Sequence, residues 1–349
     1  MTPATPSGRH HGGGPPQLPN SVGPGAADPV PDPVTGEAPA QAKPPKDANI
    51  RAIDRNEILP PGMATFAKDL AASRDPATVY RTLKGRHLYQ PNFYLEAARV
   101  LFANRQPELA RRVLSNIVEA RPGNASALRS YAYWLAEFGQ PAEAEAALRA
   151  VSANDPAAWQ VTLDRASFQA ARGDTAAATR SLTAFFTKLP ACASSSLAAM
   201  ALTELNAALP VNEMPHLPNL PHDSRINYRQ NLAADIRIVV TSTGDDDALM
   251  LSVREPGALG YSNHSDTSIF GGRIATAPNV REYMIRRAVP GTYQIHCDST
   301  RPTTIRAVIH THWGRPNHTC KVVTMLLGNP AGLNLGEVMF EFQEPGANP

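Results

Sequence analysis

The spacing of hydrophobic residues changes twice along the 349-residue chain. Residues 1–48 consist mainly of Pro, Gly, Ala and small polar residues. From Asp54 hydrophobic residues recur at helical spacing, and beyond Asp235 they alternate with polar residues as in β-strands. The pattern predicts a multidomain protein, α then β, in which an α-solenoid is followed by an antiparallel β-sandwich. Residues 1–48 are expected to form a disordered leader, interpreted as a linker rather than a proline-rich ligand.

The middle of the chain repeats with a period of 34 residues. Small alanines allow two helices to cross closely, leucine packs against the neighbouring repeat, glycine permits the turn within a hairpin, and proline ends the second helix. Arg105 stands where the first glycine of the series would fall. The residues in register are Ala98, Ala132 and Ala166; Ala110, Ala144 and Ala178; Leu114, Leu148 and Leu182; Gly139 and Gly173; and Pro122, Pro156 and Pro190.

Residues 91–190 resemble the tetratricopeptide repeat (TPR) family in this period and in these columns. The resemblance implies TPR-like helical repeats with a capping helix over residues 91–209, preceded by a helical lead-in at residues 50–90. It also implies a concave groove that binds a protein or peptide partner. The first large aromatic position of the family is weakened, because only the first of Tyr94, Leu128 and Thr162 is aromatic.

A proline-rich stretch at residues 210–232 predicts an extended linker before the β-domain. Residues 233–343 are expected to form the sandwich, followed by a tail at 344–349. Short runs of alternating hydrophobic residues, separated by turn residues and without intervening helices, are typical of this fold. The predicted strands are residues 236–241, 249–254, 283–287, 292–297, 304–311, 320–327 and 337–342.

Several short strings within residues 234–343 resemble the DUF2135 (YfaP-type) family of bacterial β-sandwich domains. They are residues 235–240, 253–256, 271–273, 282–283, 288–295 and 314–317. The family has no settled activity. Relatives are often secreted or envelope-associated, and some carry upstream VIT and von Willebrand factor A domains, which nothing in this chain resembles. Relatives tend to carry an Asp-x-Asp pair before the second strand, whereas this chain has Asp245, Asp246 and Asp247 in the preceding turn.

Two arginines beside glycines, Arg273 and Arg315, are the candidates for binding an anionic ligand, because guanidinium offers a planar set of donors. The alternative is that each arginine holds a loop through a carboxylate such as Glu282 or through carbonyl groups. Trp313 is a candidate binding aromatic in a loop, with packing of that loop as the alternative.

Histidines and acids could instead suggest a metal site. His310 and His312 alternate on one predicted strand and should share a face, with His296 and His318 nearby, which is the kind of set that binds zinc. A predicted hairpin about residues 299–302 places His296 away from His310, so solvent-facing histidines are the preferred interpretation. Asp245–Asp247 could bind Ca²⁺, but solvated turn carboxylates are preferred.

Other reactive chemistry is not indicated. Cys192, Cys297 and Cys320 are interpreted as reduced, buried thiols, in preference to a bridge between the last two. No nucleophile elbow, phosphate-binding glycine loop or zinc helix is present in the sequence. The sequence therefore predicts no catalytic residue, cofactor or metal.

The charge and hydropathy of the chain limit its partners and its location. A net charge of +2 from 33 basic and 31 acidic residues gives no indication of nucleic-acid binding. No apolar stretch approaches the ~20 residues of a membrane span, and Met1 is not followed by a secretory signal. A cytoplasmic location is expected, or a periplasmic or envelope location if the start is truncated.

The function predicted from these features is that of a non-catalytic protein-interaction scaffold, in which a TPR array accompanies a β-sandwich binding module. Two alternatives remain at this stage. One is an envelope-associated module of an exported complex that binds glycan or protein, and the other is a metal-dependent hydrolase on the sandwich. The sequence does not set the oligomeric state.

Overall fold

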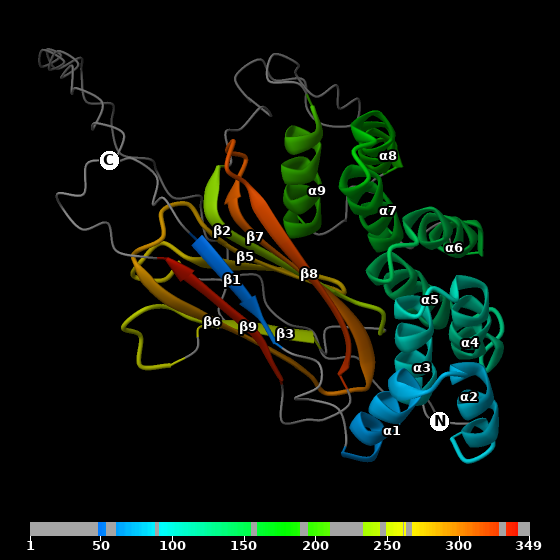
Figure 1. The fold of residues 1–349 in the computed structure, drawn as a ribbon. Coiled ribbons are helices and arrows are strands. Elements are labelled where there is room, and N and C mark those ends of the chain that lie inside the picture. Colours follow the sequence, from blue (N-terminus) through cyan, green and yellow to red (C-terminus); the bar gives the residue numbers. More distant parts are fainter. Residues whose placement is uncertain are drawn as a thin grey trace, which may run out of the picture. The chain divides into compact units, whose positions relative to one another are not determined.

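A computed structural model gives the arrangement of the helices and strands (Figure 1). The predictions for the leader, the linker at 210–232, the tail, Asp245–Asp247, Cys192, Pro156 and Pro190 lie outside the residues that it describes. All described residues belong to one unit, residues 45–349. They are residues 48–53, 61–87, 91–154, 159–188, 195–209, 233–244, 249–260, 262, 267–327 and 333–340.

Helices fill the described residues between 61 and 208, as the hydrophobic spacing predicts. The hairpin helices α3, α5 and α7 begin at residues 91, 125 and 159, and their partners α4, α6 and α8 begin at residues 107, 141 and 175. Successive hairpins are therefore 34 residues apart, which confirms the α-solenoid. The helices are α1 (Pro61–Ala72), α2 (Pro76–Lys84), α3 (Pro91–Ala103), α4 (Pro107–Glu119), α5 (Ala125–Glu137), α6 (Pro141–Asn154), α7 (Trp159–Ala171), α8 (Thr175–Lys188) and α9 (Ser195–Ala208).

The residues in register occupy the positions that their chemistry predicts. The three columns of alanine and leucine are buried in each hairpin, at 0–1% exposure. Gly139 and Gly173 adopt positive φ angles of 74° and 78° in the turn within the hairpin. Arg105 adopts the same conformation, with φ 58°, although a side chain disfavours it. Pro122 lies in the junction between α4 and α5.

Two antiparallel sheets follow the helices and confirm the sandwich. The four-stranded sheet has the order β1-β9-β6-β3, and the five-stranded sheet has the order β4-β5-β2-β7-β8. Their facing sides enclose a hydrophobic core. The strands are β1 (Ala48–Ala52), β2 (Ala234–Ser242), β3 (Leu249–Arg254), β4 (Arg273–Ala277), β5 (Val280–Ile285), β6 (Gly291–Ser299), β7 (Thr303–Trp313), β8 (Thr319–Leu327) and β9 (Leu333–Phe340).

Two strands were not expected from the sequence. Strand β1 lies before the helices, where residues 50–52 were assigned to the helical lead-in, and it pairs with β9 at the other end of the chain. Strand β4 is a short run of small and polar residues that pairs with β5 across a tight turn at Pro278 and Asn279. The other seven strands match the predicted ones, with shifts of up to four residues at their ends.

The hairpin expected about residues 299–302 is wrong. Strand β6 lies in the four-stranded sheet and β7 lies in the five-stranded sheet, so the chain crosses between sheets at this point. His296 on β6 pairs across the strand with Ser252 and Asn334 and not with a residue of β7.

The outer face of the five-stranded sheet packs against α5, α7 and α9 (Figure 1). Ser130 on α5 is hydrogen-bonded to Thr304 on β7 at 2.6 Å. Glu204 on α9 forms an ion pair with Arg237 on β2 at 2.6 Å. Helices α5 and α7 are the first helices of their hairpins, so the chain's own sheet covers the side of the array on which the concave groove was expected.

None of the described helices is both long enough and apolar enough to span a membrane.

Candidate functional site

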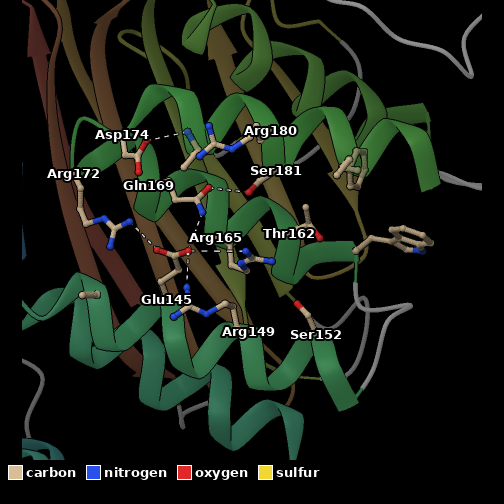
Figure 2. A pocket seen from close by; sticks show the side chains of 15 residues that line it. Glu145, Arg149, Ser152, Thr162, Arg165, Gln169, Arg172, Asp174, Arg180 and Ser181 are labelled. Carbon is tan, nitrogen blue, oxygen red and sulfur yellow. Dashed lines mark hydrogen bonds and ion pairs between the residues drawn. The ribbon is translucent and has the colours of Figure 1, made fainter.

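A polar pocket of about 700 Å³ lies between helices α6, α7 and α8 (Figure 2). Four arginine side chains surround it: Arg149, Arg165, Arg172 and Arg180. They come from three consecutive helices, and Arg172 follows the last residue of α7, so the stacking of two adjacent hairpins brings the four side chains together. The pocket is therefore a product of the repeat architecture and not of a single local motif.

The carboxylate of Glu145 on α6 lies at the centre of this group (Figure 2). Its Oε2 accepts a hydrogen bond from Arg172 Nη2 at 2.7 Å, and its Oε1 accepts from Gln169 Nε2 at 2.9 Å and from Arg149 Nη1 at 3.2 Å. Arg165 Nη2 lies 3.9 Å from the same Oε1. One buried carboxylate thus organises three guanidinium groups and one amide.

The positive charge of the pocket exceeds its negative charge. Four arginines face two carboxylates, Glu145 and Asp174. Asp174 is already engaged at the start of α8, where its Oδ1 accepts from the backbone N–H of Ala177 at 2.9 Å. Arg180 makes no hydrogen bond or ion pair with any residue that the structure describes. The Nε of Arg165 is buried and has no hydrogen-bond partner among those residues.

The two faces of α7 explain how the pocket is built. Thr162, Arg165, Gln169 and Arg172 recur every three or four residues and line the pocket. Asp164, half a turn away from that stripe, points toward α5, where its Oδ2 accepts from Tyr133 Oη at 2.7 Å. One helix therefore contacts the rest of the fold on one side and presents cations on the other.

The edge of the pocket adds an apolar surface. The rings of Trp159 and Phe185 meet edge to face, with their centroids 6.1 Å apart. Ser181 on α8 donates to Gln169 Oε1 at 2.9 Å and so fixes the amide whose other end holds Glu145. The pocket can therefore accept an anionic group in its centre and an apolar group at its rim.

The chemistry available here is recognition of anions. Guanidinium groups donate paired hydrogen bonds to carboxylate or phosphate oxygens, and they remain charged across the physiological pH range. Among the described residues, no group of three or more His, Cys, Asp or Glu could hold a metal ion.

The pocket was not predicted from the sequence, because each of its arginines, taken alone, has the pattern of a solvent-exposed residue on a helix. The repeat register contains the missing signal. Arg165 and Arg172 stand 34 residues after Tyr131 and Phe138, so cations replace rings at equivalent positions of adjacent hairpins.

The arginines and the tryptophan that the sequence singled out do not form a joint site. Arg315 is ion-paired with Asp235 and donates from Nη2 to the carbonyl oxygen of Arg286 at 3.2 Å, so it holds a loop. Arg273 is exposed at the start of β4. Trp313 ends strand β7 instead of lying in a loop, is 9% exposed, and has the guanidinium of Arg237 4.4 Å above its ring.

The predictions that His310 and His312 share a face and are solvent-facing are wrong. His310 and His312 lie on opposite faces of β7, because His312 adopts a positive φ of 53° that breaks the alternation of the strand. His312 contacts Phe340 in the core between the sheets, whereas His310 faces the helices and is hydrogen-bonded to His318 at 2.9 Å. Both residues on β7 are buried rather than solvent-facing, at 8% and 3% exposure.

Three of the short strings singled out in the sequence, residues 253–256, 271–273 and 282–283, meet at one corner of the sandwich. Glu255 accepts hydrogen bonds from Ser268 and Tyr283, each at 2.8 Å. A Cβ at Gly272 would lie 2.1 Å from Glu255 Oε1 and 2.5 Å from Tyr283 Oη. The glycine leaves room for a buried carboxylate–phenol pair, so these residues have a structural role.

The described cysteines are both unpaired. Cys297 is buried, and burial raises the pKa of its thiol to about 12. Cys320 is exposed, contrary to expectation. The two lie in different sheets, on β6 and β8, so they are not on neighbouring strands.

Comparisons with protein-family models, with curated proteins and with solved structures find no match to this chain.

Proposed function

We propose that the chain is a non-catalytic interaction protein whose helical repeats bind an acidic segment of a protein partner in the arginine pocket. The observation that carries the proposal is the excess of arginine over carboxylate in a defined pocket between α6, α7 and α8. Like charges gathered without sufficient counter-charge repel one another, so a bound anion would relieve a repulsion as well as form new hydrogen bonds.

A protein segment fits the pocket better than a single inorganic anion. The volume of about 700 Å³ lies within the range of pockets that hold groups much larger than phosphate. The partly exposed ring of Trp159 at the rim, which packs against the buried ring of Phe185, would contact an apolar side chain next to the acidic one. The β-sandwich supports this role by fixing α5, α7 and α9 in place through its outer face.

The partner would bind outside the expected concave groove, because helices α5 and α7, which would line that groove, contact the sheet. The metal-dependent hydrolase loses its basis, because His310 and His312 face opposite ways. The exported binding module and the location of the protein stay predictions.

A direct test measures the binding of a fluorescently labelled octaglutamate peptide to the full chain by anisotropy, with octaglutamine as the neutral control. Arg165→Gln and Arg180→Gln should each weaken octaglutamate binding about tenfold, which corresponds to ~1.4 kcal/mol. Arg112→Gln is the matched control, because Arg112 lies two repeats before Arg180 at the same register position and outside the pocket. Binding should also weaken at high salt.

Three results would overturn the proposal. Octaglutamate could fail to bind, it could bind equally well to the pocket variants, or Arg112→Gln could reduce binding as strongly as Arg180→Gln. If inorganic phosphate binds in the pocket and octaglutamate does not, the site recognises small anions and the protein-partner assignment is wrong.

A further inference from the structure

A second cavity, of about 290 Å³, lies between α7, α9 and the outer face of the five-stranded sheet. Its lining is mostly apolar and includes Leu163, Met200, Val239, Val308 and Val322. It is separate from the arginine pocket, which lies on the opposite face of α7. Apolar cavities of this kind, with a few polar groups directed into them, are the usual sites for small ligands.

One of those polar groups is the guanidinium of Arg306 on β7. The residue is 6% exposed, and the only hydrogen bond of its side chain to a described residue runs from Nη1 to Ser167 Oγ at 3.3 Å. Its Nε has no partner, and its Cζ lies 4.9 Å from the centroid of the Phe168 ring. Within the described part of the chain, no carboxylate oxygen lies within 4 Å of its nitrogens.

The nearest acids are already committed to other partners. Asp164 accepts from Arg129 and Tyr133, Glu204 pairs with Arg237, and Glu137 Oε2 accepts from Thr324 at 3.1 Å. These carboxylates act on Arg306 only through space, and burial lowers the pKa of its guanidinium. Burying a cation without a close counter-charge costs folding free energy, so the position of Arg306 suggests that a ligand supplies the missing negative charge.

Arg237, which lines the same cavity, shows the opposite arrangement. It is 1% exposed, and it pairs with Glu204 at 2.6 Å and with Glu282 at 2.7 Å. Two buried arginines on the same face of the sheet thus differ in the number of carboxylates that they contact. One has two carboxylates within contact distance, and the other has none.

The two histidines at the cavity do not change its charge. His310 and His318 are hydrogen-bonded to each other, and burial together with Arg237 holds the pKa of both imidazoles below its ordinary value. Both are therefore neutral near pH 7, and Arg306 remains the cation of the cavity that has no carboxylate in contact.

We infer that this cavity binds a small aliphatic carboxylate, with its head group on Arg306 and its chain against the apolar side chains of α7, α9 and the sheet. A single negative charge matches the single unpaired cation, which favours a monocarboxylate over phosphate. The volume lies at the small end of the range for ligand sites, which suits an acid of about six to eight carbons.

Titration calorimetry of the full chain with sodium hexanoate at pH 7 tests the inference. Hexanoate should bind more tightly than 1-hexanol, which lacks the charge, and more tightly than acetate, which lacks the chain. Arg306→Gln should weaken hexanoate binding at least about tenfold, or ~1.4 kcal/mol. Arg273→Gln is the matched control, since Arg273 is an exposed arginine of the same sheet and lies outside the cavity.

A second variant keeps the test decisive if Arg306→Gln does not fold. Val322→Phe leaves Arg306 intact and fills the cavity from strand β8, so it should also abolish hexanoate binding. Hexanoate binding that survives Val322→Phe, or that is no tighter than 1-hexanol binding, overturns the inference. So does a failure of hexanoate to bind the unmodified chain.

The two sites are distinguishable in the same experiments. Arg165→Gln should leave hexanoate binding unchanged, and Val322→Phe should leave octaglutamate binding unchanged. A loss of both binding activities in a variant whose circular dichroism spectrum matches that of the unmodified chain would contradict the assignment of two separate sites.

Discussion

The junction between the first two hairpins and the junction between the next two use the same register positions in opposite ways. In the first, Tyr131, Leu135 and Phe138 pack among the helices, and Leu135 is fully buried. The ring of Phe138 lies 5.0 Å from that of Phe102 and 5.7 Å from that of Trp134.

In the second junction, the positions 34 residues later hold Arg165, Gln169 and Arg172, and the space between the helices is a charged pocket. The helices begin at the same 34-residue spacing at both junctions, so the charged pocket is not required for the stacking of the hairpins. A repeat array can be stabilised by apolar contacts at one junction and keep the equivalent surface of the next junction for binding.

The largest expected effect contrasts two equivalent positions. Phe138→Ala should lower the free energy of unfolding by about 2–3 kcal/mol, because it removes a partly buried ring from an aromatic cluster. Arg172→Ala, at the same register position, should cost less than about 1 kcal/mol, since the Arg172 side chain is partly exposed and Glu145 keeps hydrogen bonds from Gln169 and Arg149. Urea denaturation measures both. Equal losses would mean that the two junctions serve the same structural purpose.

A smaller effect is expected at the centre of the pocket. Glu145→Gln should lower the free energy of unfolding by about 1–2 kcal/mol, because the arginines lose the carboxylate that separates their charges. Inorganic phosphate should raise the melting temperature of this variant more than that of the unmodified chain, since a bound anion replaces the lost charge. An identical response of the two proteins would argue against an anion site.

Transferring the two rings of the first junction to the second, together with removal of the charge of Glu145, tests the comparison directly. The triple variant Glu145→Gln, Arg165→Tyr, Arg172→Phe should unfold within about 1 kcal/mol of the unmodified chain, because rings fill the space that charges leave. It should lose octaglutamate binding completely. Retained binding in the anisotropy assay would place the site elsewhere.

The smallest effect concerns the turns within the hairpins. Arg105→Gly should raise stability by about 0.5–1 kcal/mol, because it relieves a left-handed backbone conformation that the next two hairpins assign to glycine. Gly139→Arg is the reverse change and should lower stability by a similar amount. Thermal unfolding followed by circular dichroism measures both, and shifts of the same sign would contradict this account.

The sequence predicted the helical part well because its signals are local and repeated. Alanine and leucine each recur at three register positions and glycine at two, so the pattern is repeated within the chain. Most strands were predicted for the same reason, since alternation is visible within six residues. Strand β1 was missed because its partner lies almost 290 positions away, at residues 336–340. Pairing over such a distance leaves no local pattern.

The candidate site could not be predicted in the same way. Arg165 faces a pocket only because α6 and α8 lie on either side of it, and no local spacing encodes that arrangement. His312 was misplaced because a single positive φ reversed the direction of its side chain, and alternation alone does not reveal such a change. The first failure concerns tertiary contacts, and the second concerns an irregularity of the local backbone within a correctly predicted strand.

The pairing of Ala48–Ala52 with the last strand has a consequence for how the protein can be divided. It makes the entire helical array an insertion between the first and second strands of the sandwich. A fragment that begins at residue 233 would keep eight of the nine described strands but leave one side of β9 without its hydrogen-bonding neighbour. Such an edge recruits other chains, so the fragment should self-associate unless the peptide ANIRA is supplied in trans.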